Sequence, residues 1–143
     1  MARLPEGFRH ATVTCVVAIV LVAGAQPIAW ASPATYVTDD CYHVRVRPDS
    51  IMFACADAGY TVTRLDWSTW RARTAVGRGV FHLNDCDPDC ADGTYHRRRG
   101  QITMSGRRWC PDIDKYVFRR ARVEYDHPLL DRSTTRFPLF CPL

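Results

Sequence analysis

The chain has 143 residues, of which 19 are basic and 15 acidic, and its formal net charge at pH 7 is +4. This length suits one ordinary domain, and a charge this small does not argue for nucleic acid as a partner, so we expect no specific nucleic acid binding. All the basic residues except Lys115 are arginines, which we interpret as the bias of a GC-rich coding sequence rather than selection for bidentate anion binding.

The first 31 residues are predicted to be a signal peptide that is cleaved before Ser32. Arg3 and Arg9 precede an apolar run over residues 11–25, and residues 29–31 place small side chains at the positions that a signal peptidase requires. The run has about 15 apolar residues, whereas a membrane-spanning helix needs roughly 20. We therefore expect a secreted chain, free in an extracellular space or associated with the cell envelope, rather than a membrane-anchored one.

Residues 32–143 are expected to form a single secreted domain with no transmembrane segment. Cys15 lies within the predicted signal peptide, so six cysteines remain: Cys41, Cys55, Cys86, Cys90, Cys110 and Cys141. An even number of cysteines in an exported chain predicts three disulfides, for which 15 connectivities exist. The pairing expected here is Cys86–Cys90, Cys55–Cys110 and Cys41–Cys141.

Apolar and polar residues alternate along much of this domain, which predicts β-strands rather than helices. Residues 32–40 are expected to be a loose N-terminal segment. Residues 42–47 alternate in character and predict a half-buried strand, and residues 50–56 are apolar on both faces and predict a central strand.

The next two predicted strands carry irregularities. The alternation within residues 60–67 slips after Val62, which predicts a β-bulge. The strand at residues 74–83 has Gly77 and Gly79 at alternate positions, which predicts close packing or a bend.

Three further extended segments, at residues 94–104, 116–125 and 134–141, complete a set of about seven strands. Pro138 confines the last strand to a sheet edge, because proline has no N–H to donate. The fold class predicted is all-β, an antiparallel sandwich or small barrel stapled by disulfides.

The segment Asn84–Gly93 concentrates residue types that bind metals. His82, Cys86, Cys90 and His96 have a spacing that suits zinc. In an exported protein, however, thiols oxidise, and the Asp-Pro between the two cysteines favours a turn that brings them together. We therefore predict a structural bridge at this position.

Calcium is the second metal for which this segment carries suitable residues, because its three alternate aspartates follow a D-x-D-x-D spacing. An EF-hand loop needs glycine at its sixth position and glutamate at its twelfth, and Cys90 and His96 occupy those positions. We expect neither a metal nor an organic cofactor.

Two groups of residues are candidates for binding. Arg97, Arg98 and Arg99 form a basic cluster, to which Arg107, Arg108, Arg119, Arg120 and Arg122 add if their strands pair. Such a face attracts anionic polymers such as teichoic acids, nucleic acids or acidic glycans, although a merely solvated strand face is the interpretation we favour. Trp67 and Trp70 are candidates for a carbohydrate platform, but we expect them to fill the core.

Catalytic motifs are absent from the sequence. It contains no G-x-S-x-G, no H-E-x-x-H and no phosphate-binding loop. Because distant residues can assemble an active site, whether the protein is an enzyme stays open, with a non-enzymatic role favoured.

The segments RPDSIMFACADAGY, DWSTW, VGRGVF and NDCDPDCADGTY, followed by Cys110, resemble a group of small, exported, cysteine-containing proteins of actinobacteria. The resemblance covers residues 47–110, and the spacings of cysteine and tryptophan match together. It departs from the group at Ala58, which precedes Gly59 where the group often has C-A-D-G directly, and this concerns the geometry of one turn. The resemblance implies export and a stapled fold, and it supplies no catalytic residue.

The function expected is that of a secreted, non-enzymatic binding or structural module, whose partner is an anionic cell-envelope polymer or an extracellular protein. One alternative is a small secreted hydrolase in which His82 or His96 lies beside an aspartate of the turn. Another is an inhibitor-like or toxin-like domain that presents residues 84–93 as a rigid, protruding loop.

Overall fold

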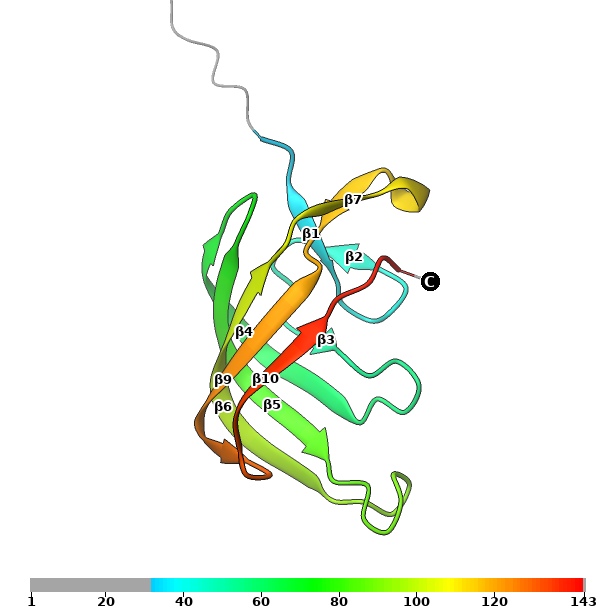
Figure 1. Ribbon diagram of the computed structural model, residues 1–143, viewed down its shortest axis with the longest axis vertical. Coiled ribbons are helices and arrows are strands. Elements are labelled where there is room, and N and C mark those ends of the chain that lie inside the picture. Colours follow the sequence, from blue (N-terminus) through cyan, green and yellow to red (C-terminus); the bar gives the residue numbers. More distant parts are fainter. Residues whose placement is uncertain (1–31, 143) are drawn as a thin grey trace, which may run out of the picture. The chain divides into compact units, whose positions relative to one another are not determined.

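A computed structural model describes residues 32–142 of the protein, which form two β-sheets and one short 3₁₀ helix (Figure 1). The predicted signal peptide, residues 1–31, and Cys15 within it lie outside the described residues. Within residues 32–142, no helix has the length and apolar character that crossing a membrane would require.

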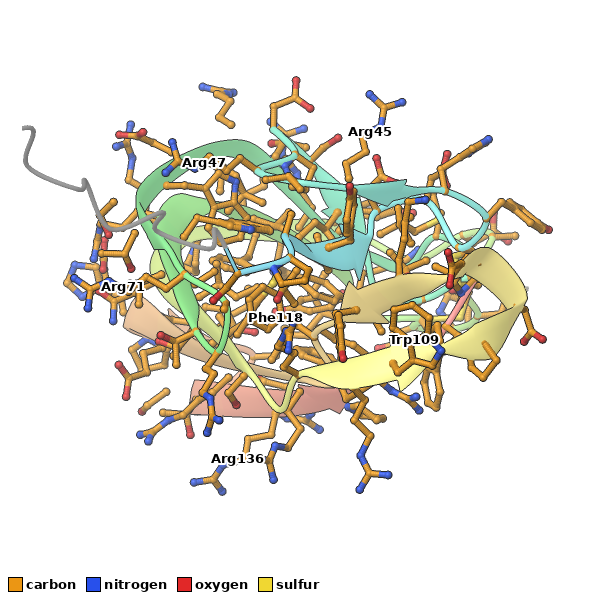
Figure 2. The ribbon with its side chains drawn as sticks, turned by 90° about the horizontal axis from the view of Figure 1, so that it is seen from above. Arg45, Arg47, Arg71, Trp109, Phe118 and Arg136 are labelled. Atoms are coloured by element: carbon orange, nitrogen blue, oxygen red, sulfur yellow. A yellow bond between two sulfur atoms is a disulfide. The ribbon has the colours of Figure 1, made fainter. Side chains whose placement is uncertain are left out.

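The larger sheet has six strands, all antiparallel, and curls into a half-barrel (Figure 2). In spatial order the strands are β10 (Arg132–Pro138), β9 (Arg120–Leu129), β6 (Tyr95–Ser105), β5 (Ala75–Asn84), β4 (Tyr60–Trp70) and β3 (Ile51–Met52). The predicted all-β class is therefore confirmed. Pro138 lies on the edge strand β10, as expected.

The smaller sheet has four strands and covers one end of the core. In spatial order they are β2 (Val44–Arg45), β1 (Thr35–Thr38), β8 (Lys115–Val117) and β7 (Arg108–Cys110), and the 3₁₀ helix η1 (Pro111–Ile113) joins β7 to β8. Strands β1 and β8 run parallel, and the other pairs are antiparallel.

Two expectations about the N-terminal half were wrong. Residues 32–40 are not loose, because β1 is an inner strand and Val37 is fully buried. A strand of four residues is too short to give a clear alternation, which is why the sequence did not reveal it. Residues 50–56 do not form a central strand: only Ile51 and Met52 pair, at the sheet edge, and the chain then turns away.

The core lies between the half-barrel and the smaller sheet. Its largest fully buried side chains on the half-barrel are Phe81, Ile51, Ile102 and Met104, and Val37 and Phe118 join them from the smaller sheet and the β8–β9 link. Figure 2 looks down on this core, with Phe118 in its middle.

The predicted bulge and the predicted close packing are both present in β4 and β5. The register between these strands shifts between Thr63 and Asp66, which returns Leu65 and Trp67 to the core side. A Cβ at Gly77 would lie 2.7 Å from the Trp67 ring, and a Cβ at Gly79 would lie 2.8 Å from Val62. Both glycines are therefore needed because side chains of β4 cross over them.

The six cysteines of the described domain form three disulfides, and the bridge Cys86–Cys90 was predicted correctly. The other two predicted pairs were wrong, because the bridges are Cys41–Cys55 and Cys110–Cys141. Three disulfides, with no membrane-spanning helix among the described residues, are compatible with an extracellular protein.

Backbone pairing explains the observed connectivity. The N–H of Met52 donates to the Asp39 carbonyl (2.8 Å), which places the chain beside Cys41 next to the segment that holds Cys55. The N–H of Leu139 donates to the Arg119 carbonyl (2.8 Å), which brings the C-terminal segment to the smaller sheet and to Cys110. These long-range hydrogen bonds are invisible in cysteine spacing alone.

Candidate anion-binding groove

Three adjoining depressions cross the surface where the β4–β5, β6–β7 and β8–β9 connections meet strands β9 and β10. The first and second share Arg119 and Arg120, and the second and third share Gly106 and Arg107. The largest has a volume of about 450 Å³. We call this surface the arginine groove and define it by seven residues: Arg73, Arg107, Arg108, Arg119, Arg120, Arg122 and Arg136.

Strand pairing assembles the centre of the groove. Strand β9 lies between β6 and β10, and Arg122 is directly opposite Arg136 in the β9–β10 ladder. Like charges directly opposite each other destabilise a sheet. A cleft lined by charges of one sign raises the local concentration of ligands of the opposite sign.

Few carboxylates compensate these cations. Among the described residues, Arg122 is the only arginine of the groove with an ion-pair partner, its Nη2 lying 2.7 Å from Oε1 of Glu124. Elsewhere among the described residues, Arg45 is paired with Asp39 at 2.7 Å and Arg78 with Asp126 at 2.6 Å. The groove therefore gathers six arginines that have no ion-pair partner among the described residues.

Two of the arginines are held in place by the protein. Arg119 donates through Nε to the carbonyl oxygen of Leu139 (2.7 Å). Arg107 donates through Nε to Oγ1 of Thr35 (3.0 Å), and its guanidinium carbon lies 3.3 Å from the centroid of the Tyr116 ring. Side chains that are already ordered lose less conformational entropy when a ligand binds.

The basic cluster Arg97–Arg99 does not form a single patch, because successive residues of a strand point to opposite faces. Arg97 and Arg99 are opposite His82 and Val80 on the outer face of the half-barrel. Arg98 points to the other face, where its Nε donates to the Pro128 carbonyl oxygen (3.1 Å). The arginine groove lies nearer the other end of β6, beside Ser105.

Trp67 and Trp70 pack against the core rather than forming an open platform. Their rings meet edge to face at 4.6 Å, and their indole N–H groups donate to the Pro48 carbonyl oxygen (2.7 Å) and the Thr35 carbonyl oxygen (2.9 Å). Their polar atoms are thus used inside the fold, as the core-filling interpretation expects.

The segment Asn84–Gly93 is a loop that its own side chains hold in shape. Asn84 accepts from the Cys86 N–H (2.9 Å) and donates to the Cys90 carbonyl oxygen (2.8 Å). Asp89 accepts from two backbone N–H groups further along the loop. The aspartates therefore shape the loop, and the two cysteine sulfurs are bonded to each other rather than available as thiolate ligands.

His96 does lie beside an aspartate, as the hydrolase alternative requires. Its Nε2 is 2.8 Å from Oδ2 of Asp85, whose other oxygen accepts from the Thr94 N–H (2.8 Å). The bond to His96 and the backbone N–H groups lower the pKa of the Asp85 carboxyl to about 2.

Replacing His96 by alanine is expected to raise the pKa of Asp85 toward its ordinary value of 3.8, because the imidazole is the largest cause of the lowering. The measurement is a side-chain ¹³C NMR titration. Asp40 is the internal control, since its own lowered pKa depends on His43 and should not move. An Asp85 midpoint that stays near 2 in the variant would contradict this assignment.

The histidines do not complete a nucleophilic site within the described residues. The Thr63 hydroxyl lies 3.0 Å from Nε2 of His82, but that ring has no carboxylate partner among the hydrogen bonds. Burial, followed by the charges of Arg97 and Arg64, lowers the pKa of His82. His96 contacts the carboxylate of Asp85 but has no hydroxyl group among its hydrogen-bond partners. A triad needs both contacts on one imidazole.

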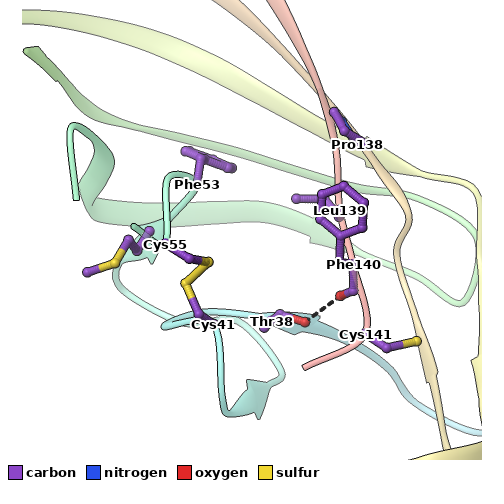
Figure 3. Close-up of a pocket in the computed structure, with 9 residues that line it drawn as sticks. Thr38, Cys41, Phe53, Cys55, Pro138, Leu139, Phe140 and Cys141 are labelled. Atoms are coloured by element: carbon purple, nitrogen blue, oxygen red, sulfur yellow. Dashed lines mark hydrogen bonds between the residues drawn. A yellow bond between two sulfur atoms is a disulfide. The ribbon is translucent and has the colours of Figure 1, made fainter. Parts of the chain in front are cut away.

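Apart from the arginine groove, an apolar hollow of about 310 Å³ lies between two disulfides. Figure 3 shows Cys41 and Cys55 on one side and the segment Pro138–Cys141 on the other. Its one side-chain hydroxyl, on Thr38, donates to the Phe140 carbonyl oxygen (2.7 Å). It is lined by no histidine, serine or carboxylate, so it offers few groups to orient a polar ligand.

Comparison with known proteins adds no assignment, since no protein-family model, no curated protein and no solved structure matches the chain.

Proposed function

We propose that the protein is a secreted, non-enzymatic binding module that holds an anionic polymer of the cell envelope or extracellular space in its arginine groove. The observation that carries the proposal is the set of seven arginines with a single carboxylate partner among the described residues. Guanidinium groups pair bidentately with carboxylate, phosphate and sulfate, so the groove suits any of these anions.

The extent of the groove favours a polymer over a small anion. Three depressions follow one another from Arg73 to Arg136, and each has its own arginines. A chain that carries regularly spaced charges engages all of them at once, whereas a single anion uses one. The proposal does not include sequence-specific nucleic acid binding, because contacts to phosphate carry no sequence information.

The proposal includes export. It treats residues 1–31 as a signal peptide and places the protein among the small exported actinobacterial proteins that residues 47–110 resemble. The three disulfides support it, because such bonds persist in oxidising compartments.

The double variant Arg120→Ala, Arg136→Ala tests the groove directly. We expect its affinity for dextran sulfate at low salt to fall about tenfold, because two charge-assisted contacts are removed. Wild-type affinity should itself fall steeply between 50 and 200 mM salt, to ~10% or less, and more gently in the variant. Isothermal titration calorimetry on the exported, oxidised protein measures both quantities.

The double variant Arg97→Ala, Arg99→Ala is the matched control, because it removes the same charge from the far end of the same face. We expect its affinity to stay within about twofold of wild type. If the control loses binding and the groove variant does not, the polymer lies over β5 and β6 instead. If the wild type binds no polyanion at 50 mM salt, the proposed function is wrong.

The loop Asn84–Gly93 favours a second candidate function, that of an inhibitor-like module. Residues 87–92 are exposed, and the Cys86–Cys90 bridge closes the loop that joins β5 to β6 (Figure 1). Inhibition of a panel of secreted proteases by the wild type, abolished when Asp87–Asp89 is replaced by three glycines, would support it. Polyanion affinity should be the same in both proteins.

A further inference from the structure

An exposed aromatic pair adjoins the arginine groove. Trp109 on β7 has 46% of its surface exposed. It is the only exposed tryptophan among the described residues. Its ring meets that of Tyr116 on β8 at a centroid distance of 4.9 Å, nearly edge to face. Figure 2 shows Trp109 at the outside of the molecule, well away from the buried Phe118.

Strand geometry joins this pair to the groove. Trp109 and Tyr116 are directly opposite each other in the β7–β8 ladder, so their side chains share a face. Arg107 lies two residues before Trp109, and its guanidinium covers the Tyr116 ring at 3.3 Å. The same Arg107 lines two of the three depressions. A ligand that leaves the groove past Arg107 therefore meets the aromatic pair.

The combination of flat apolar rings and guanidinium groups restricts the ligand chemistry. A chain of phosphates alone, such as polyphosphate, pairs with arginines and gains little from an exposed indole. A polymer of sugar rings that carries carboxylates or sulfates uses both, since the C–H face of a pyranose packs on an aromatic ring. Tryptophan is well suited to this contact because it offers a large, rigid apolar surface with a polar edge.

We propose that the ligand of the arginine groove is an acidic polysaccharide, whose sugar rings pack on Trp109 while its anionic groups pair with the arginines. This inference rests on the proposed function, because it names the class of polymer that the same groove takes. Tyr116 packs against the indole and Arg107 packs against the Tyr116 ring, which holds the indole beside the groove.

The test compares three polymers on the exported, oxidised protein. Polygalacturonate and dextran sulfate supply sugar rings with carboxylates or sulfates, and linear polyphosphate of matched charge supplies anions alone. We expect Trp109→Ala to weaken binding of at least one acidic glycan about tenfold and that of polyphosphate by less than about twofold. Trp109→Phe should recover part of the loss, since it restores a flat ring.

A second readout does not depend on the variants. Trp67 and Trp70 are packed on the core, so a ligand on the surface reaches Trp109 first. We expect an acidic glycan to change the intrinsic tryptophan fluorescence and polyphosphate to leave it unchanged.

The outcomes separate the two proposals. Equal losses of affinity for glycan and polyphosphate in Trp109→Ala, or no loss for either, would contradict an acidic polysaccharide as the ligand. The arginine groove would still stand as the site that binds anions. Tight binding of polyphosphate with no binding of either glycan would do the same. Failure of all three polymers to bind would contradict both the proposed function and this inference. Neutral dextran is the control for contacts that need no charge.

Discussion

Replacing Cys110 and Cys141 together by alanine is expected to lower the free energy of unfolding by about 4 kcal/mol, which follows from the 31-residue separation that this bridge closes. The bond restricts the unfolded chain more than either of the other two, whose separations are 14 and 4 residues. Because domains of this size have a net stability of only about 5–15 kcal/mol, the loss is a large share of the total. Urea denaturation of both proteins measures it.

The double variant Cys86→Ala, Cys90→Ala is the matched control, since it removes the same atoms from a much shorter covalent loop. We expect it to lose about 2 kcal/mol, because the chain entropy that a bridge removes grows with the logarithm of the loop length. Equal losses in the two double variants would show that loop closure does not set the stabilisation here. Non-reducing peptide mapping should find Cys110 joined to Cys141 in the wild type.

The Cys110–Cys141 bridge also holds one wall of the arginine groove. Cys141 lies two residues after Leu139, whose carbonyl oxygen accepts from Arg119. Without the bridge, the C-terminal segment loses its covalent tie to β7, and Arg119 loses a fixed acceptor. The variant should therefore bind dextran sulfate more weakly than wild type even at temperatures where it remains folded.

Local sequence patterns predicted the structural features that depend on neighbouring residues in the chain. The slip in alternation after Val62 indicated the β4 bulge, and Gly77 and Gly79 indicated a close approach that the Trp67 and Val62 side chains make. The bridge Cys86–Cys90 was predictable for the same reason, because a turn of four residues suffices to form it.

Features that depend on strand register were not predictable. Arg122 and Arg136 lie opposite each other only because β9 and β10 pair in one particular register, and no spacing in the sequence specifies it. Five of the seven groove arginines were expected from the sequence, and Arg136 was missed for this reason. Arg73 was missed because it lies in the β4–β5 connection, which reaches the groove only in the folded chain. Trp109 was also missed, since a three-residue strand is too short to reveal which of its side chains face solvent.

The run Arg97–Arg99 shows how a cluster of charges in the sequence can be divided by the fold. Three consecutive cations suggest one patch in the sequence, yet the two-residue period of a strand divides them between two faces. Charge that is dispersed along the sequence, by contrast, converges in the groove because several connections meet beside β9 and β10. Counting charges within a segment therefore predicted where basic residues occur but not where they gather.

Phe118→Ala is expected to lower the free energy of unfolding by about 3–5 kcal/mol, the usual cost of truncating a fully buried phenylalanine. Phe118 lies between β8 and β9 and links the two sheets. Its N–H donates to the Tyr36 carbonyl oxygen (2.9 Å) in the smaller sheet, and its ring meets Trp70 of the half-barrel at 5.6 Å. Urea denaturation followed by tryptophan fluorescence and by circular dichroism measures the loss.

Phe140→Ala makes the same truncation at a residue with 62% of its surface exposed, and it should change stability by less than about 0.5 kcal/mol. If both variants cost the same, Phe118 does not have the coupling role described here. The two spectroscopic probes add a sharper criterion, because coincident transitions indicate that the sheets unfold together. We expect coincidence in the wild type and in Phe140→Ala. In Phe118→Ala the smaller sheet, which has four short strands, should separate first, because the variant loses the ring contact between Phe118 and Trp70 and keeps the hydrogen bond from the Trp70 indole to the Thr35 carbonyl oxygen.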